Sequence, residues 1–182
     1  QKFRYANKLL PTHIMKQQYY SLACPHLIGA IEIWGTDQAN NIQLQPLIRT
    51  QKKLIRLVKN LPPRTHTLPL KVELEILGLP ELYTLRTSIG MHEHVYPQER
   101  KNRPEHNHSY IETNTVHSYS TRHSQQATLH QTYDMNHFTK KYTKIWNGLP
   151  KELRETKEIG PFKRKLTRHL LDKQIRDLNE LD

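Results

Sequence analysis

The sequence lacks the features that mark several large classes of protein. It holds a single cysteine, Cys24, so it cannot form an internal disulfide bond. No apolar run approaches the roughly 18 residues of a membrane-spanning helix, because Pro25 and Glu32 interrupt the stretch from residue 23 to residue 34. The amino terminus also lacks the apolar core of a secretory signal peptide. We therefore expect neither a disulfide framework nor a membrane segment.

Closely spaced carboxylates, which a polymerase or nuclease needs to hold Mg²⁺, are also missing. Asp37 and Asp134 are isolated in the sequence. Glu73 and Glu75 are expected on opposite sides of a helix, because neighbours two residues apart do not share a helical face. We predict no catalytic residue, no metal site and no resident cofactor in this chain.

The twelve histidines raise the question of a zinc site, but their spacing does not fit one. Cys24 has no second cysteine, and four histidines lie in polar segments without structural-site spacing, namely His106, His108, His117 and His123. A thiolate pair of Cys24 and His26 would need positions i and i+2 to face each other, which a helix does not allow. Loop histidines and a buried structural thiol are the simpler interpretation, and an enzyme using Cys24 and His26 stays a further hypothesis.

The charge balance is strongly basic. Lys and Arg number 28 against 17 Asp and Glu, which gives a formal net charge of +11 and a pI near 9.8. Such an excess is typical of proteins that bind nucleic acid or an anionic membrane surface. The apolar fraction of 35% is low, which favours elongated or partly disordered structure. The chain begins with Gln1 and not with methionine, so we expect a piece of a longer protein.

Acidic residues are absent between Asp37 and Glu73, and residues 44–59 within this stretch predict a helix with two stripes. Gln51 belongs to the apolar stripe, whose other members are Leu44, Leu47, Ile48, Leu54, Ile55 and Val58. Cations repeat at i, i+3, i+4, i+7 and i+10 on another face and form what we call the basic stripe, Arg49, Lys52, Lys53, Arg56 and Lys59. Two interpretations stay open: a solvated basic face, or a surface that binds nucleic acid.

The remaining patterns predict a mainly α protein. Helical periodicity begins at Thr12, is kinked or restarted at Pro25 and ends at Gly35. Further helices are expected at residues 68–77, stopped by Gly78, at 81–96 with Pro80 in the first turn, at 151–155, and from near Pro161 to the carboxyl end. The polar stretch from Pro97 to Ser109 predicts a mobile loop.

One departure from helix is expected near the carboxyl-terminal third. Residues 129–133 and 138–142 alternate apolar and polar side chains, which predicts a small β-hairpin that turns at residues 134–136. The expected organisation is a helical, thumb-like domain at residues 1–96, a mobile polar loop at 97–116, and a segment with short strands and terminal helices at 117–182.

Other residues are candidates for nucleic-acid contact. Aromatic rings near basic segments could stack on bases or lie in the core, and these are Tyr19, Tyr20, Trp34 and Trp146. Arg122 lies in a Ser/Thr-rich segment without acids, where it could bind phosphate or be buried against backbone carbonyls. The last predicted helix exposes a second set of cations, the C-terminal basic patch, consisting of Lys163, Arg164, Lys165 and Arg168.

Six strings, in this order, give the chain a family resemblance. It resembles the carboxyl-terminal part of reverse transcriptases from non-LTR (LINE-type) retrotransposons, the part that follows the polymerase palm. The strings span nearly the whole chain and are YYSLACPHLIGAIEIWG (19–35), LQPLIRTQKKLIRLV (44–58), HTLPLKVELEILGLPELY (66–83), HSYSTR (117–122), KIWNGLP (144–150) and FKRKLTRHLL (162–171). No single string is diagnostic, but six in register make coincidence a poor explanation.

The resemblance implies a binding function and no catalytic activity in this part of the polymerase. In that family the region corresponding to the first helices is the thumb, which packs against the template–primer duplex behind the palm. It implies a non-catalytic part of an RNA-directed DNA polymerase that grips RNA, an RNA–DNA hybrid or DNA through the phosphate backbone, in a nuclear or cytoplasmic ribonucleoprotein. The palm, and the Mg²⁺ it would hold, lie outside this chain, and no small-molecule substrate is expected. The alternative is a helical protein-interaction or scaffold module with a solvated basic face.

Overall fold

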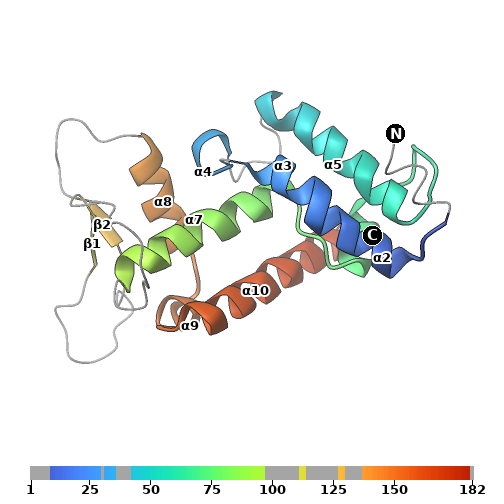
Figure 1. Cartoon of the computed structure of the whole chain (residues 1–182). Coiled ribbons are helices and arrows are strands. Elements are labelled where there is room, and N and C mark those ends of the chain that lie inside the picture. Colours follow the sequence, from blue (N-terminus) through green and yellow to red (C-terminus); the bar gives the residue numbers. More distant parts are fainter. Residues whose placement is uncertain are drawn as a thin grey trace. The chain divides into compact units, whose positions relative to one another are not determined.

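The computed structural model describes residues 9–29, 31–35, 42–96, 111–113, 127–129 and 137–180, and these are mainly helical, as the sequence predicts (Figure 1). By its contacts the chain divides into two compact units. The first unit comprises Gln1–Tyr83 and His169–Asp182, and the second comprises Thr84–Arg168. The boundaries at residues 96 and 117 and the loop between them stay predictions, because residues 97–110 and 114–126 lie outside the described ranges. In the described ranges, no helix has both the length and the apolar character needed to cross a membrane.

The first unit begins with a run of short helices. α2 (Thr12–Gln18) continues into a π-helical turn, η1 (Tyr19–Ala23), and then into α3 (Cys24–Ile28), α4 (Ile31–Trp34) and a 3₁₀ turn, η2 (Ile42–Leu44). Pro25 lies in the first turn of α3, directly after the π-helical turn, so the helix type changes where the sequence predicts a kink or restart. α4 ends before Gly35, where a Cβ would come within 2.5 Å of the Tyr83 ring.

α5 (Gln45–Val58) packs against α2 in the first unit, and its apolar stripe explains this packing (Figure 1). Ile48, Gln51, Ile55 and Val58 are buried, whereas Leu47 and Leu54 at the margins of the stripe are half-buried. Fully burying an aliphatic side chain contributes about 1.5–3 kcal/mol. The i, i+3, i+4 spacing of apolar residues therefore fixes which face of α5 enters the core.

Two helices of the first unit end in the same hydrogen-bonding motif. At the end of α5 the Leu61 N–H donates to the Arg56 carbonyl, and Asn60 has a φ of 55°. At the end of α6 (Leu68–Glu73) the Ile76 N–H donates to the Lys71 carbonyl, and Glu75 has a φ of 52°. Both are Schellman-type ends with a left-handed residue, a position that glycine usually occupies.

The helix predicted at residues 68–77 therefore ends early, at Glu73, and Gly78 does not stop it. The left-handed residue Glu75 turns the chain before the apolar residues 76 and 77 can continue the helix. Residues 76–78 run without helical structure to α7 (Leu79–Val95), whose first turn contains Pro80 as expected.

The second unit has a separate aromatic core. It contains most of α7, the strands β1 (Ile111–Thr113) and β2 (Ala127–Leu129), the helices α8 (His137–Asn147) and α9 (Lys151–Arg154), and the first part of α10 (Ile159–Asn179). His92 stacks on Phe162 with ring centroids 4.3 Å apart, and its Nε2 is 2.8 Å from the Thr156 carbonyl oxygen. Trp146, which has no exposed surface, packs against the same two rings.

The predicted β-hairpin is not supported. Residues 138–142, expected as its second strand, lie in α8. Phe138, Tyr142 and Trp146 also repeat at i, i+4 and i+8, so the alternation that predicts a strand fits a helix equally well. Burying Trp146 favours the helix. Leu129 instead ends β2, which pairs with β1 in antiparallel register, Ile111 opposite Leu129.

Candidate nucleic-acid interface and the cavity beside it

Three cations of the basic stripe are available to a ligand. Arg49 and Lys53 are exposed on α5, and Lys52 is half-buried. In the described residues, none of the three side chains forms an ion pair. They repeat at i, i+3 and i+4, so they lie on neighbouring positions of one helical surface. Arg49 and Lys53 thus present exposed positive charges away from the core of α5, Lys52 lies at the margin of this surface, and none of the three is paired with a carboxylate of the described residues.

The other two cations of the basic stripe are engaged within the first unit. The Arg56 Nε donates a hydrogen bond to the Thr65 carbonyl oxygen at 2.7 Å, which ties the segment after α5 back to the helix. Lys59 forms an ion pair with Glu73 of α6. Glu73 is the first acid after the acid-free stretch, and the turn between α5 and α6 brings it to Lys59. Only tertiary structure shows that these two cations already have partners within the unit.

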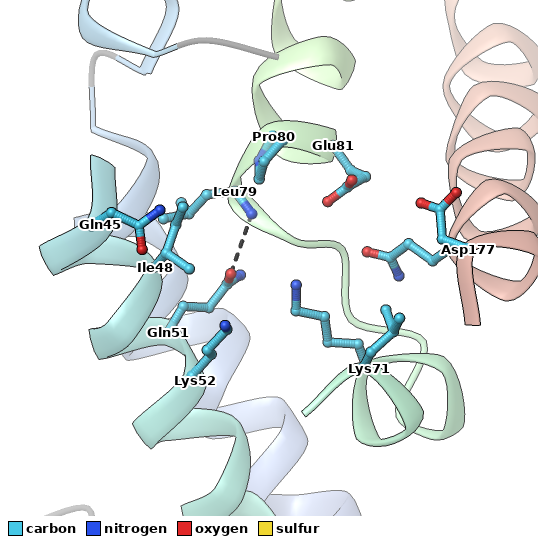
Figure 2. A pocket seen from close by; sticks show the side chains of 11 residues that line it. Gln45, Ile48, Gln51, Lys52, Lys71, Leu79, Pro80, Glu81 and Asp177 are labelled. Carbon is cyan, nitrogen blue, oxygen red and sulfur yellow. Dashed lines mark hydrogen bonds between the residues drawn. The ribbon is translucent and has the colours of Figure 1, made fainter. Parts of the chain in front are cut away.

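Lys52 also borders a cavity of about 340 Å³ in the first unit (Figure 2). Four charged side chains line it, from three helices and the end of α10, namely Lys52, Lys71, Glu81 and Asp177. Burial lowers the pKa of Lys71, and the neighbouring Lys52 charge lowers it further, whereas Glu81 acts in the opposite direction. The cavity therefore contains a lysine whose charge the surroundings disfavour.

Two buried glutamines that line the cavity, Gln51 and Gln174, also hold a backbone segment, residues 76–79, of which Leu79 lines the cavity. The Gln51 amide donates to the Leu77 carbonyl at 2.9 Å and accepts from the Leu79 N–H at 3.2 Å. Figure 2 shows the second of these bonds. The Gln174 amide of α10 donates to the Ile76 carbonyl at 3.2 Å and accepts from the Gly78 N–H at 2.9 Å. Four backbone groups of an otherwise irregular segment are thereby satisfied without water.

The predicted stacking aromatics differ in exposure. Tyr19 and Trp146 have no exposed surface, so both rings are core residues in this structure. The Tyr19 hydroxyl accepts a hydrogen bond from Gln51 at 2.9 Å. Tyr20 is 42% exposed, and its hydroxyl donates to the Glu75 carbonyl at 3.0 Å. Burial, together with the neighbouring Cys24 and Glu75, raises the pKa of Tyr20 to about 12. Only the side chains of these three are described, and that of Trp34 is not.

The C-terminal basic patch lies on α10 in the second unit. Lys163, Arg164, Lys165 and Arg168 are all exposed, whereas Phe162 and Leu166 on the same helix are fully buried. Lys165 donates a hydrogen bond to the Thr156 hydroxyl at 3.3 Å. Arg122 lies outside the described residues.

Other chemistry finds no support in the described ranges. They contain no group of three His, Cys, Asp or Glu side chains that could hold a metal ion. The Cys24 thiol is buried, with 6% of the residue's surface exposed.

The sequence does not predict the cavity, but it does indicate that two glutamines lining it are buried. Gln51 interrupts the apolar stripe of α5, and Gln174 follows Phe162, Leu166 and Leu170 at the i+4 spacing of the buried face of α10. A polar amide on an apolar face predicts a buried hydrogen bond. Nothing local in the sequence predicts that Lys71, Glu81 and Asp177 line one cavity.

Comparison with known proteins adds no relative. No family model, no curated protein and no solved structure matches this chain. The function must therefore be argued from the surfaces described above and from the sequence resemblance.

Proposed function

We propose that this chain is a non-catalytic segment of a retrotransposon-type RNA-directed DNA polymerase that binds the phosphate backbone of RNA or of an RNA–DNA hybrid. The observation that supports it best is the set of three ligand-accessible cations on α5, Arg49, Lys52 and Lys53, which form no ion pair in the described residues. The sequence resemblance supplies the polymerase context, and the charges supply the binding chemistry.

Counterion release drives this kind of binding. A lysine or arginine that neutralises a phosphate releases a condensed cation, and this gain depends on salt but not on base sequence. Arg49 and Lys53 are exposed, and neither has to displace a carboxylate of the described residues before it reaches a phosphate. Arg56 and Lys59 would first have to break contacts with Thr65 and Glu73. We therefore expect three cations of α5, and not all five of the basic stripe, to contact phosphates.

The C-terminal basic patch is a second candidate contact for the same ligand. Its four cations are exposed on one helix, and Lys165 gives up only a hydrogen bond to an exposed threonine hydroxyl. A duplex offers phosphates at regular intervals along each strand, so two basic surfaces can add their contributions without base-specific contacts.

The test is a fluorescence anisotropy titration of the chain with a labelled RNA–DNA hybrid, at salt concentrations between about 50 and 200 mM. The three α5 cations should contribute about −2.7 to the slope of log K against log salt, and the C-terminal basic patch should make the total steeper. Binding that does not change over this range would exclude the proposal.

A charge-matched pair of variants assigns the effect to α5. Arg49→Gln combined with Lys53→Gln should reduce the magnitude of the slope by about 1.8. Lys144→Gln combined with Lys173→Gln removes the same charge from exposed positions elsewhere and serves as the control. If both double variants lose affinity equally, net charge alone explains the binding. If neither loses affinity, the chain is better described as a protein-interaction module with a solvated basic face.

A further inference from the structure

The Lys71 amine lies in the cavity beside α5 without a hydrogen-bonding partner. In the part of the chain that the structure describes, no hydrogen bond or ion pair reaches its Nζ, although Glu81 is close enough to favour its charge (Figure 2). Lys71 is half-buried, and a partly desolvated ammonium without a hydrogen-bonding partner lowers the stability of the fold.

Two positive charges converge on this cavity from different helices. Lys52 borders it from α5 and Lys71 from α6, and each opposes the charge of the other. An anion bound between the two amines would remove this repulsion and replace the missing partner of Lys71. The basic stripe shares Lys52 with the cavity, so a phosphate bound here would be continuous with the proposed backbone contact.

Gly78 provides space for the charged groups. A Cβ at this position would lie 2.7 Å from the Lys71 Nζ and 2.3 Å from the Glu81 Oε2, closer than non-bonded atoms tolerate. Both atoms are the ends of flexible side chains and would have to move. The absence of a side chain at Gly78 therefore leaves room for the ends of the Lys71 and Glu81 side chains.

We propose that this cavity binds a phosphate group between the side chains of Lys52 and Lys71. The inference deepens the proposed function and rests on it for one source of the ligand, the terminal phosphate of a nucleic acid strand. The other source is a free nucleotide or inorganic phosphate. With a volume of about 340 Å³, the cavity is at the small end of ligand pockets, which fits a phosphate with at most one attached nucleoside.

The two carboxylates of the cavity make the inference specific. Glu81 and Asp177 face the same space and repel an anion, so they weaken phosphate binding without abolishing it. Removal of one carboxylate should strengthen binding of a phosphate and weaken binding of a cation. Glu81→Gln thus separates an anion site from a cation site.

The first experiment compares hybrids that differ only in a 5′ phosphate, using the full-length chain and the anisotropy assay above. We expect the chain to bind the phosphorylated hybrid about tenfold more tightly, the effect of one charge-assisted contact. Lys71→Met should remove this preference, Lys71→Arg should keep part of it, and Glu81→Gln should enlarge it. Gly78→Ala should reduce the preference without changing the net charge.

The second experiment tests the free-phosphate source without a nucleic acid. Limited acetylation followed by peptide mass mapping measures how fast the Lys71 amine reacts, and inorganic phosphate or a nucleoside monophosphate should slow it severalfold. Lys53, exposed on the same surface, is the internal control and should react at an unchanged rate. Protection by phosphate without a 5′-phosphate preference would identify the free compound as the ligand.

Failure of this inference is distinguishable from failure of the proposed function. Salt-dependent hybrid binding, with no 5′-phosphate preference and no protection of Lys71, would overturn the phosphate site and leave backbone binding intact. Weaker binding by Glu81→Gln would also overturn it. Urea unfolding of Lys71→Met should give equal or higher stability than the wild type, so a loss of phosphate preference in this variant cannot be assigned to unfolding.

Discussion

Gln51 of α5 and Gln174 of α10 bind alternating backbone groups of the same short segment, residues 76–79. The Gln174 side chain forms hydrogen bonds with the Ile76 carbonyl and the Gly78 N–H. The Gln51 side chain does so with the Leu77 carbonyl and the Leu79 N–H. The two side chains are 1% and 2% exposed. Together they satisfy the backbone groups that a neighbouring strand would otherwise bond, which lets an irregular segment lie in the core of the first unit beside the cavity.

Replacing either glutamine with leucine should destabilise the chain. Each substitution leaves buried backbone groups without partners, and each unsatisfied group costs about 1–3 kcal/mol. Gln51→Leu removes three hydrogen bonds, including the one to Tyr19, and should cost about 3 kcal/mol, whereas Gln174→Leu removes two and should cost about 2 kcal/mol. Urea unfolding measures both. Gln17→Leu on the exposed face of α2 is the control and should change stability by less than about 0.5 kcal/mol.

Replacing Glu75, the left-handed residue that ends α6, with glycine should raise the stability of the chain. Glu75 has a φ of 52°, which costs a residue with a Cβ about 1–2 kcal/mol. Glu75→Gly should therefore stabilise the chain. Its free energy of unfolding should exceed that of Glu75→Ala by about 1 kcal/mol. Both variants lose the exposed ion pair to Lys16, so the comparison isolates the backbone term. Equal thermal midpoints for the two variants would contradict the assigned backbone conformation.

The stability of the chain should depend on pH through His169. Burial lowers the pKa of His169 below its ordinary value, and the nearby charges of Arg176 and Lys173 lower it further, against the effect of Asp172. The unfolded state therefore binds a proton more readily, and the free energy of unfolding falls as the pH falls through about 6.5. His169→Gln should lose less stability than the wild type between about pH 8 and pH 5.5, measured by urea unfolding. His13→Gln, an exposed site on α2, is the control.

The burial of Trp146 predicts its fluorescence. In a Trp34→Phe chain, Trp146 is the remaining tryptophan, and it packs against His92 and Phe162 with no exposed surface. Its emission should be blue-shifted, resistant to acrylamide and unchanged when the RNA–DNA hybrid is added. Strong quenching by the hybrid would mean that the ring stacks on a base, contrary to its position in the core.

The two kinds of cation on α5 should behave differently on binding. Lys53→Gln should weaken hybrid binding and reduce the magnitude of the salt slope by about 0.9, because Lys53 is exposed. Lys59→Gln should change the slope much less, because Lys59 is paired with Glu73. Its effect on folding should be under about 1 kcal/mol, as for most surface ion pairs. A larger effect of Lys59 than of Lys53 on the slope would reverse this assignment.

The sequence by itself determined most of the helices, because helical periodicity and proline positions are local properties. The apolar stripe of α5 follows from side-chain spacing, and the change of helix type next to Pro25 follows from the missing proline N–H. The predicted hairpin was wrong because apolar alternation over five residues cannot be told from one helical face. Burial of Trp146 in α8 resolved that ambiguity, and burial is a tertiary property.

Only the tertiary structure decided which charges are available and where a cavity lies. All five cations of the basic stripe look alike in the sequence, and the fold pairs Lys59 with Glu73, joins Arg56 to Thr65 and leaves Arg49 and Lys53 exposed. Lys71 and Asp177 line one cavity although 106 positions separate them (177 − 71). Charge interactions act through space, so the chain order of these residues carries no information about which of them meet.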